Sequence, residues 1–113
     1  MTTTTDDARK EEPWVDQIFT VDKGRLRATK DMYWEFIEDF DKAIAKLLDS
    51  RRSRVEIDLT QVTFISSSYL GCLSNMVVMA ARKKKRIILK VNQDVSWLFD
   101  IMGGQKNVCM EIY

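Results

Sequence analysis

The sequence predicts an α/β fold, with a mixed β-sheet of about four to five strands and helices packed against it. Two observations lead to this prediction. Short runs rich in Val, Ile and Leu alternate along the chain with longer segments in which apolar residues recur every three to four positions. In addition, strand, helix and strand follow one another in the second half, an order that favours a right-handed parallel crossover, whereas a glycine turn near residue 24 favours an antiparallel hairpin.

Strands are expected where apolar residues alternate with polar ones or form a short β-branched run. The first two flank the turn at 22–24, and the third has Val, Ile and Leu at every second position from residue 55. The expected strands cover residues 17–21, 25–28, 54–59, 86–91 and 108–113.

Three helices are expected from the helical spacing of apolar residues. Thr29 or Asp31 is the expected cap of the first helix, and Gly103-Gly104 is expected to end the third through a left-handed C-cap. The expected helices cover residues 31–49, 69–85 and 95–102. The buried stripe of the first helix comprises Tyr33, Phe36, Ile37, Phe40, Ile44 and Leu47. Trp34 lies beside that stripe, where it covers the helix edge or contacts a partner.

Length and composition indicate one soluble globular domain. The chain has 113 residues, 45% of them hydrophobic and 31% charged, and a chain of this size can bury a core without disulfides or metals. Residues 1–13 are polar and charged without apolar periodicity, so a disordered N-terminal tail is expected, followed by a single domain over residues 14–113. The N-terminus has no secretory leader and no apolar stretch is long enough to span a membrane, so a cytoplasmic protein is expected.

Charge and residue types disfavour several classes of function. The formal net charge is +1 and the chain has no histidine. A near-neutral chain has little bulk attraction to nucleic acid, and the lack of histidine removes the commonest general base and most zinc sites. We therefore expect a protein that is not an enzyme and that holds no metal or cofactor. Cys72 and Cys109 are expected to be small core residues.

Three consecutive serines, Ser66, Ser67 and Ser68, stand where the third strand gives way to the second helix. In open α/β sheets, ligands and modifications gather at the carboxyl ends of strands, and the free N–H groups of a helix N-terminus favour an anion. The hydroxyls are thus candidates for phosphorylation. The alternative is that one serine caps the helix while the other two are merely exposed to solvent, and spacing leaves both interpretations open.

The residues around the serines form an extended pattern, Val55-x-Ile57-Asp58-Leu59-x-x-Val62-x-Phe64-Ile65-x-Ser67-Ser68-x-Leu70-Gly71. This pattern resembles the signature of the STAS domain family, which includes the bacterial anti-sigma factor antagonists. The resemblance extends in kind and order over roughly residues 17–113, through the strand at 87–89 and the apolar residues at 95–99. It implies a STAS-like sheet with helices packed against it.

The resemblance also implies a partner-switching regulator of transcription in a bacterial signal-transduction pathway. In that family, one serine of the turn is phosphorylated by a GHKL-type serine kinase that doubles as an anti-sigma factor. The matching acceptor is Ser68, with Ser67 and Ser66 as alternatives. The phosphate would add about −1.5 to −2 charges and disrupt docking of the kinase. The docking surface is expected to include Ser67, Ser68, Tyr69 and Trp97, the alternative for Trp97 being that it packs against a neighbouring helix.

Several positions depart from the family pattern. Ser66 stands where the family has aspartate, and Tyr69 stands where it has glycine, so the tyrosine ring is expected beside the acceptor. Residues 27–31 lack the usual Gly-x-Leu-Asp, and the chain stops at Tyr113 where relatives continue into another helix, which implies a short variant or a trimmed chain. The alternative function is a constitutive, non-phosphorylated STAS scaffold or an accessory subunit of a signalling complex or membrane transporter. The oligomeric state, monomer or dimer, stays open.

Two basic clusters lie outside this motif, five consecutive cations at 82–86 and three arginines within 51–54. Such clusters could bind phosphate groups, but cations also complement the dipole of a helix C-terminus, which is the interpretation favoured here. Because each cluster precedes a strand whereas the serines follow one, both clusters are expected at the opposite end of the sheet. Neither nucleic-acid binding nor direct membrane insertion is expected.

Overall fold

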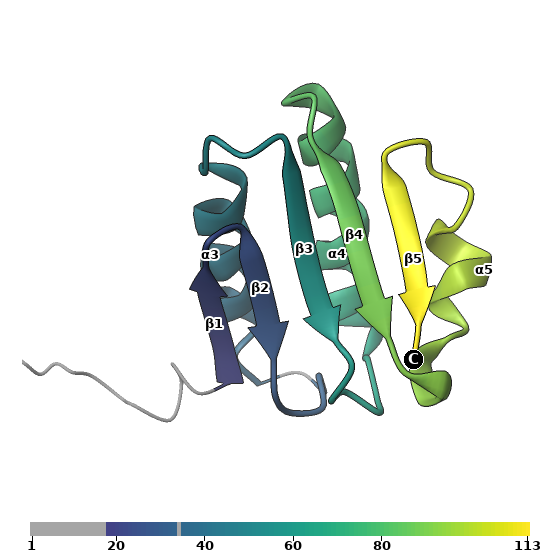
Figure 1. The fold of residues 1–113 in the computed structure, drawn as a ribbon. Helices are drawn as coiled ribbons and strands as arrows, with labels where there is room; N and C mark the ends of the chain where they lie inside the picture. The colour runs from purple at the N-terminus through teal and green to yellow at the C-terminus, as the bar shows by residue number, and fades with distance from the viewer. Residues whose placement is uncertain (1–17, 34) are drawn as a thin grey trace, which may run out of the picture.

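A five-stranded sheet with helices on one face is the framework of the protein (Figure 1). The computed structural model describes residues 18–33 and 35–113. The strands are β1 Phe19–Asp22, β2 Arg25–Ala28, β3 Arg54–Leu59, β4 Arg86–Val91 and β5 Val108–Ile112. The helices are α3 Ile37–Leu48, α4 Ser67–Arg82 and α5 Leu98–Met102, with the 3-10 turn η1 Gln93–Val95 before α5. The predicted α/β fold is confirmed, while the predicted tail and the role of Trp34 lie outside the described residues.

The strands follow one another across the sheet in chain order. The first pair, β1 and β2, is antiparallel, and the pairs β2–β3, β3–β4 and β4–β5 are parallel. Lys23 and Gly24 connect the antiparallel pair with φ angles of 53° and 80°, which is the left-handed backbone that a two-residue hairpin turn requires. The parallel arrangement places the starts of β2 to β5 at one end of the domain and their carboxyl ends at the other.

The core lies between the sheet and the helices. Along β3, the side chains of Val55, Ile57 and Leu59 are buried, while Glu56 faces the other side of the sheet. The helices cover this inner face, and the outer face is open to solvent (Figure 1). The largest fully buried side chains are Tyr69, Phe40, Leu26, Met32, Leu47, Leu48, Ile57, Leu59, Leu73, Met76, Ile87 and Leu89.

The first helix begins later than the sequence pattern predicts. It starts at Ile37 instead of residue 31, and neither expected cap occupies its N-terminus, since the residue before the helix is Phe36 in a left-handed conformation with φ 64°. The reason is that residues 31 and 32 are engaged elsewhere: Met32 forms a parallel β-bridge with Ile65. Tyr33, expected in the buried stripe, is instead 50% exposed.

Smaller differences concern the ends of elements and the cysteines. The bounds of β3 and β4 agree with the predicted strands, and α4 starts two residues earlier than predicted. Gly103 ends α5 with φ −65°, so the predicted left-handed C-cap is wrong. Cys109 is exposed on the outer face of the sheet beside Ile88, so its predicted place in the core is also wrong.

Two properties of the described part of the chain bear on broad function. None of its helices is long and apolar enough to cross a lipid bilayer. Within residues 18–33 and 35–113, no group of three or more Cys, Asp or Glu side chains could hold a metal ion.

Candidate functional site, the seryl turn

The loop between β3 and α4, residues 60–66, carries the serines to the carboxyl end of the sheet. Asp31, which follows β2, holds this loop from one side. Its carboxylate accepts hydrogen bonds from the N–H of Thr63 at 2.6 Å, from the Thr63 hydroxyl at 2.8 and 2.9 Å, and from the N–H of Phe64 at 3.2 Å. These bonds, led by the one from the Thr63 backbone, lower the pKa of Asp31.

Asn92, which follows β4, holds the same loop from the other side. Its side-chain amide donates to the carbonyl oxygens of Thr60 at 2.8 Å and Val62 at 2.7 Å. The loop is therefore fixed between the ends of both neighbouring strands. Two short polar side chains far apart in the sequence thus fix where α4 begins.

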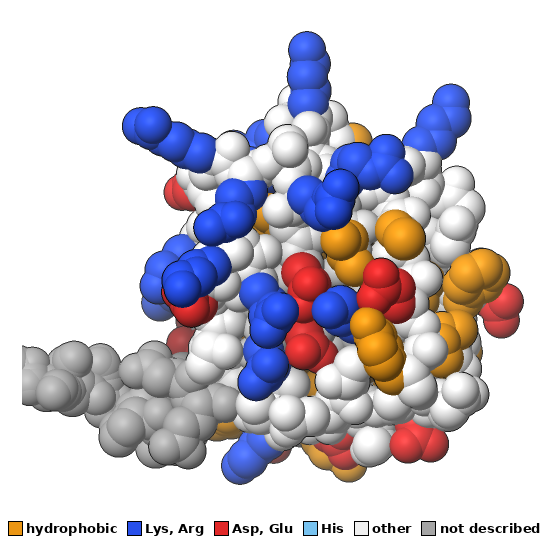
Figure 2. All heavy atoms as spheres, in the orientation of Figure 1, with side chains coloured by type: hydrophobic (Ala, Val, Ile, Leu, Met, Phe, Trp, Pro, Cys, Tyr) orange, Lys and Arg blue, Asp and Glu red, His pale blue; other side chains and the backbone are white. Residues whose placement is uncertain are grey.

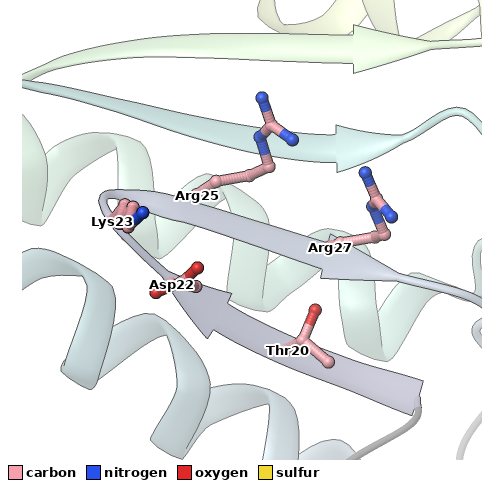
Figure 3. Close-up of a pocket in the computed structure, with 5 residues that line it drawn as sticks. All are labelled: Thr20, Asp22, Lys23, Arg25 and Arg27. Atoms are coloured by element: carbon pink, nitrogen blue, oxygen red, sulfur yellow. The ribbon is translucent and has the colours of Figure 1, made fainter.

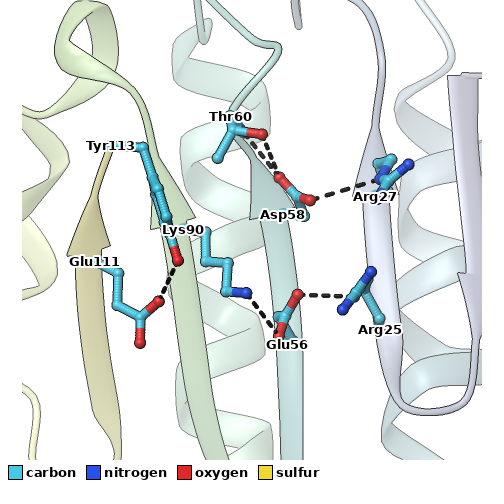
Figure 4. Close-up of polar contacts among 8 residues, drawn as sticks. All are labelled: Arg25, Arg27, Glu56, Asp58, Thr60, Lys90, Glu111 and Tyr113. Carbon is cyan, nitrogen blue, oxygen red and sulfur yellow. Dashed lines mark hydrogen bonds and ion pairs between the residues drawn. The ribbon is translucent and has the colours of Figure 1, made fainter.

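Asp58, the aspartate of the family signature, lies at the end of β3 on the outer face of the sheet. Its carboxylate accepts from the N–H of Thr60 at 3.0 Å and from the Thr60 hydroxyl at 2.7 Å, and Arg27 lies 3.5 Å away (Figure 4). Burial opposes ionisation of this carboxyl, but the Thr60 bonds and the charge of Arg27 outweigh it and lower the pKa of Asp58. Asp58 is therefore ionised, and its bonds to Thr60 hold the turn by which the chain leaves β3.

The first of the three serines caps α4. Ser66 has an extended backbone, its Oγ accepts from the N–H of Tyr69 at 3.5 Å, and its own N–H donates to the Met32 carbonyl at 2.7 Å. Ser67 and Ser68 form the exposed start of the first turn, and their hydroxyls have no hydrogen bond with a residue that the structure describes. One serine thus has a structural role, and two hydroxyls remain accessible.

Tyr69 points inward, so its predicted place beside the acceptor at the surface is wrong. The side chain is 1% exposed, and its ring centroid lies 5.2 Å from that of Phe40 and 6.3 Å from that of Phe19. Its hydroxyl donates to the Glu35 carbonyl. Burial, followed by the charges of nearby acids, raises the pKa of Tyr69 to about 12, so the phenol is neutral at physiological pH. The helical periodicity is responsible, because Tyr69 precedes the buried Leu73 by one turn.

Exposed aromatic side chains accompany the serines at this end of the sheet. Tyr33 and Phe64 stack with ring centroids 4.7 Å apart and are 50% and 44% exposed. Trp97, a predicted contact residue, is 39% exposed and immediately precedes α5, which follows the carboxyl end of β4. The sequence reasoning missed the Tyr33–Phe64 pair because both residues fitted apolar patterns. The parallel strand order, which brings residue 33 beside residue 64, is the signal that could have found it.

A small apolar hollow of about 160 Å³ lies where α4 meets α5. Val78 and Ile101 are 49% and 47% exposed there.

Cys72, on α4, is partly buried, and burial, with a hydrogen bond to Asp41, raises the pKa of its thiol to about 11. This thiol is therefore protonated at neutral pH and weakly nucleophilic.

The outer face of the sheet carries a ladder of ion pairs (Figure 4). Glu56 lies 2.8 Å from the Arg25 guanidinium and 3.2 Å from the Lys90 ammonium. Beside it, a hollow of about 340 Å³ lies over the hairpin (Figure 3). Its lining comprises Thr20, Asp22, Lys23, Arg25 and Arg27. Arg25 and Arg27 are already paired with the acids of β3, so Lys23 and Asp22 are the charged lining residues that have no ion pair with a described residue.

An open α/β sheet with a seryl turn at the carboxyl end of a parallel strand defines a class of small domain, and comparison with known proteins identifies it. The family model described as "Mlab, STAS domain" matches residues 16–106. The chain belongs to the STAS domain family. The match includes the seryl turn, both of its supporting residues, Asp31 and Asn92, and Trp97. No curated protein matches the sequence.

Proposed function

We propose that this STAS protein is a partner-switching regulator of the anti-sigma factor antagonist type. It binds a GHKL-type serine kinase through the seryl-turn end and is released when Ser68 is phosphorylated. In this role it is the substrate of an enzyme and not an enzyme itself, and it works in the cytoplasm. The observation that carries the proposal is the exposed Ser68 hydroxyl on the first turn of α4, on a domain of the STAS family.

Hydrogen bonding favours Ser68 and its neighbour Ser67 over Ser66 as the acceptor. Ser66 uses its hydroxyl to cap α4, so phosphorylation there would remove a cap worth about 1 kcal/mol. A phosphate on Ser67 or Ser68 would instead lie beside the unpaired N–H groups of the first turn, which favour an anion. Of these two residues, Ser68 matches the acceptor position of the family pattern.

The inward orientation of Tyr69 supports access to the acceptor. A glycine occupies this position in the family pattern, and the tyrosine ring here fills the core instead of the surface. The Tyr69 ring therefore does not cover the surface next to Ser68. The aromatic pair Tyr33 and Phe64 supplies apolar area of the kind enriched at protein interfaces.

A phosphate on Ser68 would weaken docking through charge and desolvation. This end of the domain already carries acids, among them Asp31, Glu35, Asp94 and Asp100. A further −1.5 to −2 charges would have to be buried against the partner next to apolar rings. The switch thus requires no movement of the sheet.

The test is to incubate the chain with GHKL-type serine kinases from its own cell and ATP, followed by peptide mass analysis. We expect one phosphate on Ser68, lost in Ser68→Ala and kept in Ser53→Ala, a control at an exposed serine at the opposite end. Binding of the kinase should weaken at least tenfold in Ser68→Glu. An unmodified Ser68, together with unchanged binding by Ser68→Glu, would refute the proposal.

The apolar hollow at α4 and α5 favours a second candidate, a constitutive scaffold or accessory subunit of a signalling complex or membrane transporter. A partner held by Val78 and Ile101 would bind without regard to the state of Ser68. In that case Ile101→Asp abolishes binding while Ser68→Glu leaves it unchanged. The partner-switching proposal predicts instead that Ser68→Glu by itself weakens binding.

A further inference from the structure

Lys and Arg side chains gather at the end of the molecule where the parallel strands begin (Figure 2). We call this surface the basic pole. It is formed by the α3–β3 loop and the start of β3, and by the α4–β4 turn and the start of β4. Its exposed members are Arg51, Arg52, Arg54, Lys83, Lys84 and Arg86. The sequence clusters at 51–54 and 82–86 therefore form one surface at the end opposite the serines, as their order relative to the strands predicted.

Buried polar contacts fix the two segments of the basic pole against each other. Lys85, only 8% exposed, points inward, and its ammonium donates to the carbonyl oxygens of Ser50 at 2.7 Å and Arg52 at 2.6 Å. The N–H of Arg86 donates to the Ser53 carbonyl at 2.8 Å. One cation of the 82–86 run thus stabilises the structure, and the cations on either side of it are held facing solvent.

Two arginines of the basic pole are neighbours without a counter-ion. Arg54 and Arg86 are register partners across the β3–β4 pair, on the outer face. Neither has an ion pair with a residue in the described part of the chain, whereas Glu56 and Asp58 further along β3 are paired with cations. Like charges directly opposite each other destabilise a sheet, so an external anion would relieve this repulsion.

Charge is therefore distributed unevenly along the strand axis in a chain whose formal net charge is only +1, although one exposed acid, Asp49 at the end of α3, lies beside the basic pole. Asp31, Glu35 and Asp94 lie at the seryl end, because each follows the carboxyl end of a strand or precedes α3. An anionic surface would attract the basic pole and repel the seryl end. The charge distribution selects one orientation of the molecule, which the near-zero total conceals.

We propose that the basic pole docks the protein peripherally onto an anionic phospholipid surface, with the seryl turn directed away from the lipid. The cations project from loops and strand starts over one end of the molecule, an arrangement suited to the headgroups of an anionic leaflet. Proteins that bind single-stranded nucleic acid stack its bases on exposed aromatic rings. In the described residues, the exposed aromatic rings lie at the end opposite the basic pole. Lipid is therefore the favoured polyanion.

The test is co-sedimentation of the full chain with vesicles of phosphatidylglycerol and phosphatidylcholine, compared with vesicles of phosphatidylcholine alone. We expect binding to the anionic vesicles only, lost between 0.1 and 0.5 M NaCl because the attraction is screened. The double variant Lys83→Gln/Lys84→Gln should weaken binding by about 30-fold. The matched control, Lys30→Gln/Lys42→Gln, removes the same charge elsewhere and should change binding less than threefold.

Four outcomes would overturn the proposal. These are equal binding to neutral vesicles, equal losses in the two double variants, tighter binding to a 20-base-pair DNA duplex than to anionic vesicles, and displacement by inorganic phosphate at constant ionic strength. The third would assign the surface to nucleic acid and the fourth to a soluble phosphate. Both variants replace exposed side chains, and circular dichroism before sedimentation confirms that they are folded. The result is independent of Ser68 and of any kinase.

Discussion

The two ends of the sheet hold opposite chemistry. At the carboxyl end, the serines, the stacked rings of Tyr33 and Phe64 and several acids surround the start of α4. At the other end, the basic pole surrounds the end of the same helix. Each end is held by its own polar contacts, through Asp31 and Asn92 at the seryl end and through Lys85 at the basic pole. In a parallel sheet, whether a residue precedes or follows its strand decides which end it reaches, so a local sequence feature becomes a global division of charge.

The prediction with the largest expected effect tests whether the Tyr69 ring, at the seryl end, packs in the core. Tyr69→Ala should lower the free energy of unfolding by about 3–5 kcal/mol, because a buried aromatic ring packed on Phe19 and Phe40 is removed. Tyr69→Phe keeps the ring and should cost about 1 kcal/mol, the value of the hydrogen bond to Glu35. Urea denaturation measures both. If Tyr69→Ala were as stable as Ser68→Ala, the ring would not lie in the core.

The basic pole has the next largest effect, at its one buried cation. Lys85→Met should cost about 2 kcal/mol, because the carbonyl oxygens of Ser50 and Arg52 lose a charged donor. Lys84→Met, one residue away and exposed, should change stability by less than about 0.5 kcal/mol. Thermal unfolding of the two variants side by side distinguishes the buried member of the run from its exposed neighbour. Similar losses would contradict the inward position of Lys85.

Much of the framework could be predicted from the sequence, since period-two and helical patterns report which side chains are buried. The bounds of β3 and β4 are examples. The late start of α3 could not, because Asp31 and Met32 bind a loop more than thirty residues away, and no local pattern contains that partner. The inward orientation of Tyr69 could have been predicted from the sequence, since helical spacing places Tyr69 on the same face as Leu73.

The same local limit applies to the candidate site. The seryl turn was found from sequence because its strand, serines and helix are consecutive. The Tyr33–Phe64 pair and the joining of the two basic clusters depend on contacts between distant segments. The formal net charge of +1 does not indicate the basic pole, because that surface forms only when the fold brings the two basic clusters together.

A smaller effect is expected for Asn92 at the seryl end. Asn92→Ala removes two hydrogen bonds to the loop before α4 and should cost about 1–2 kcal/mol. Gln93→Ala, an exposed neighbour, should be nearly neutral. Hydrogen exchange should show faster exchange over residues 62–68 and unchanged exchange over residues 83–86. Faster exchange at both ends would mean that the two ends are not independent.

The smallest effect concerns pH and also separates the ends. Hydrogen bonds from Thr63 and Phe64 lower the pKa of Asp31, so the stabilisation from this carboxylate is fully present above the unfolded value of about 3.9 and is lost as the pH falls through the lower folded value. Asp31→Asn should therefore cost about 1 kcal/mol at pH 7, and this difference should shrink below pH 4. Urea denaturation at a series of pH values from 7 down to 2.5 measures it.

Thr63→Val provides the matched control for Asp31, since it removes the hydroxyl donor and leaves both N–H donors in place. Thr63→Val should reproduce only the part of the pH-dependent difference in stability that comes from the hydroxyl donor. A pH dependence that survived Asp31→Asn in full would have to come from another carboxyl, and Asp58 is the described carboxyl whose pKa is also lowered. Because Asp58 is held by Thr60 and Arg27 on the outer face, that result would move the acid-sensitive contact from the β2 side of the seryl loop to the end of β3 itself.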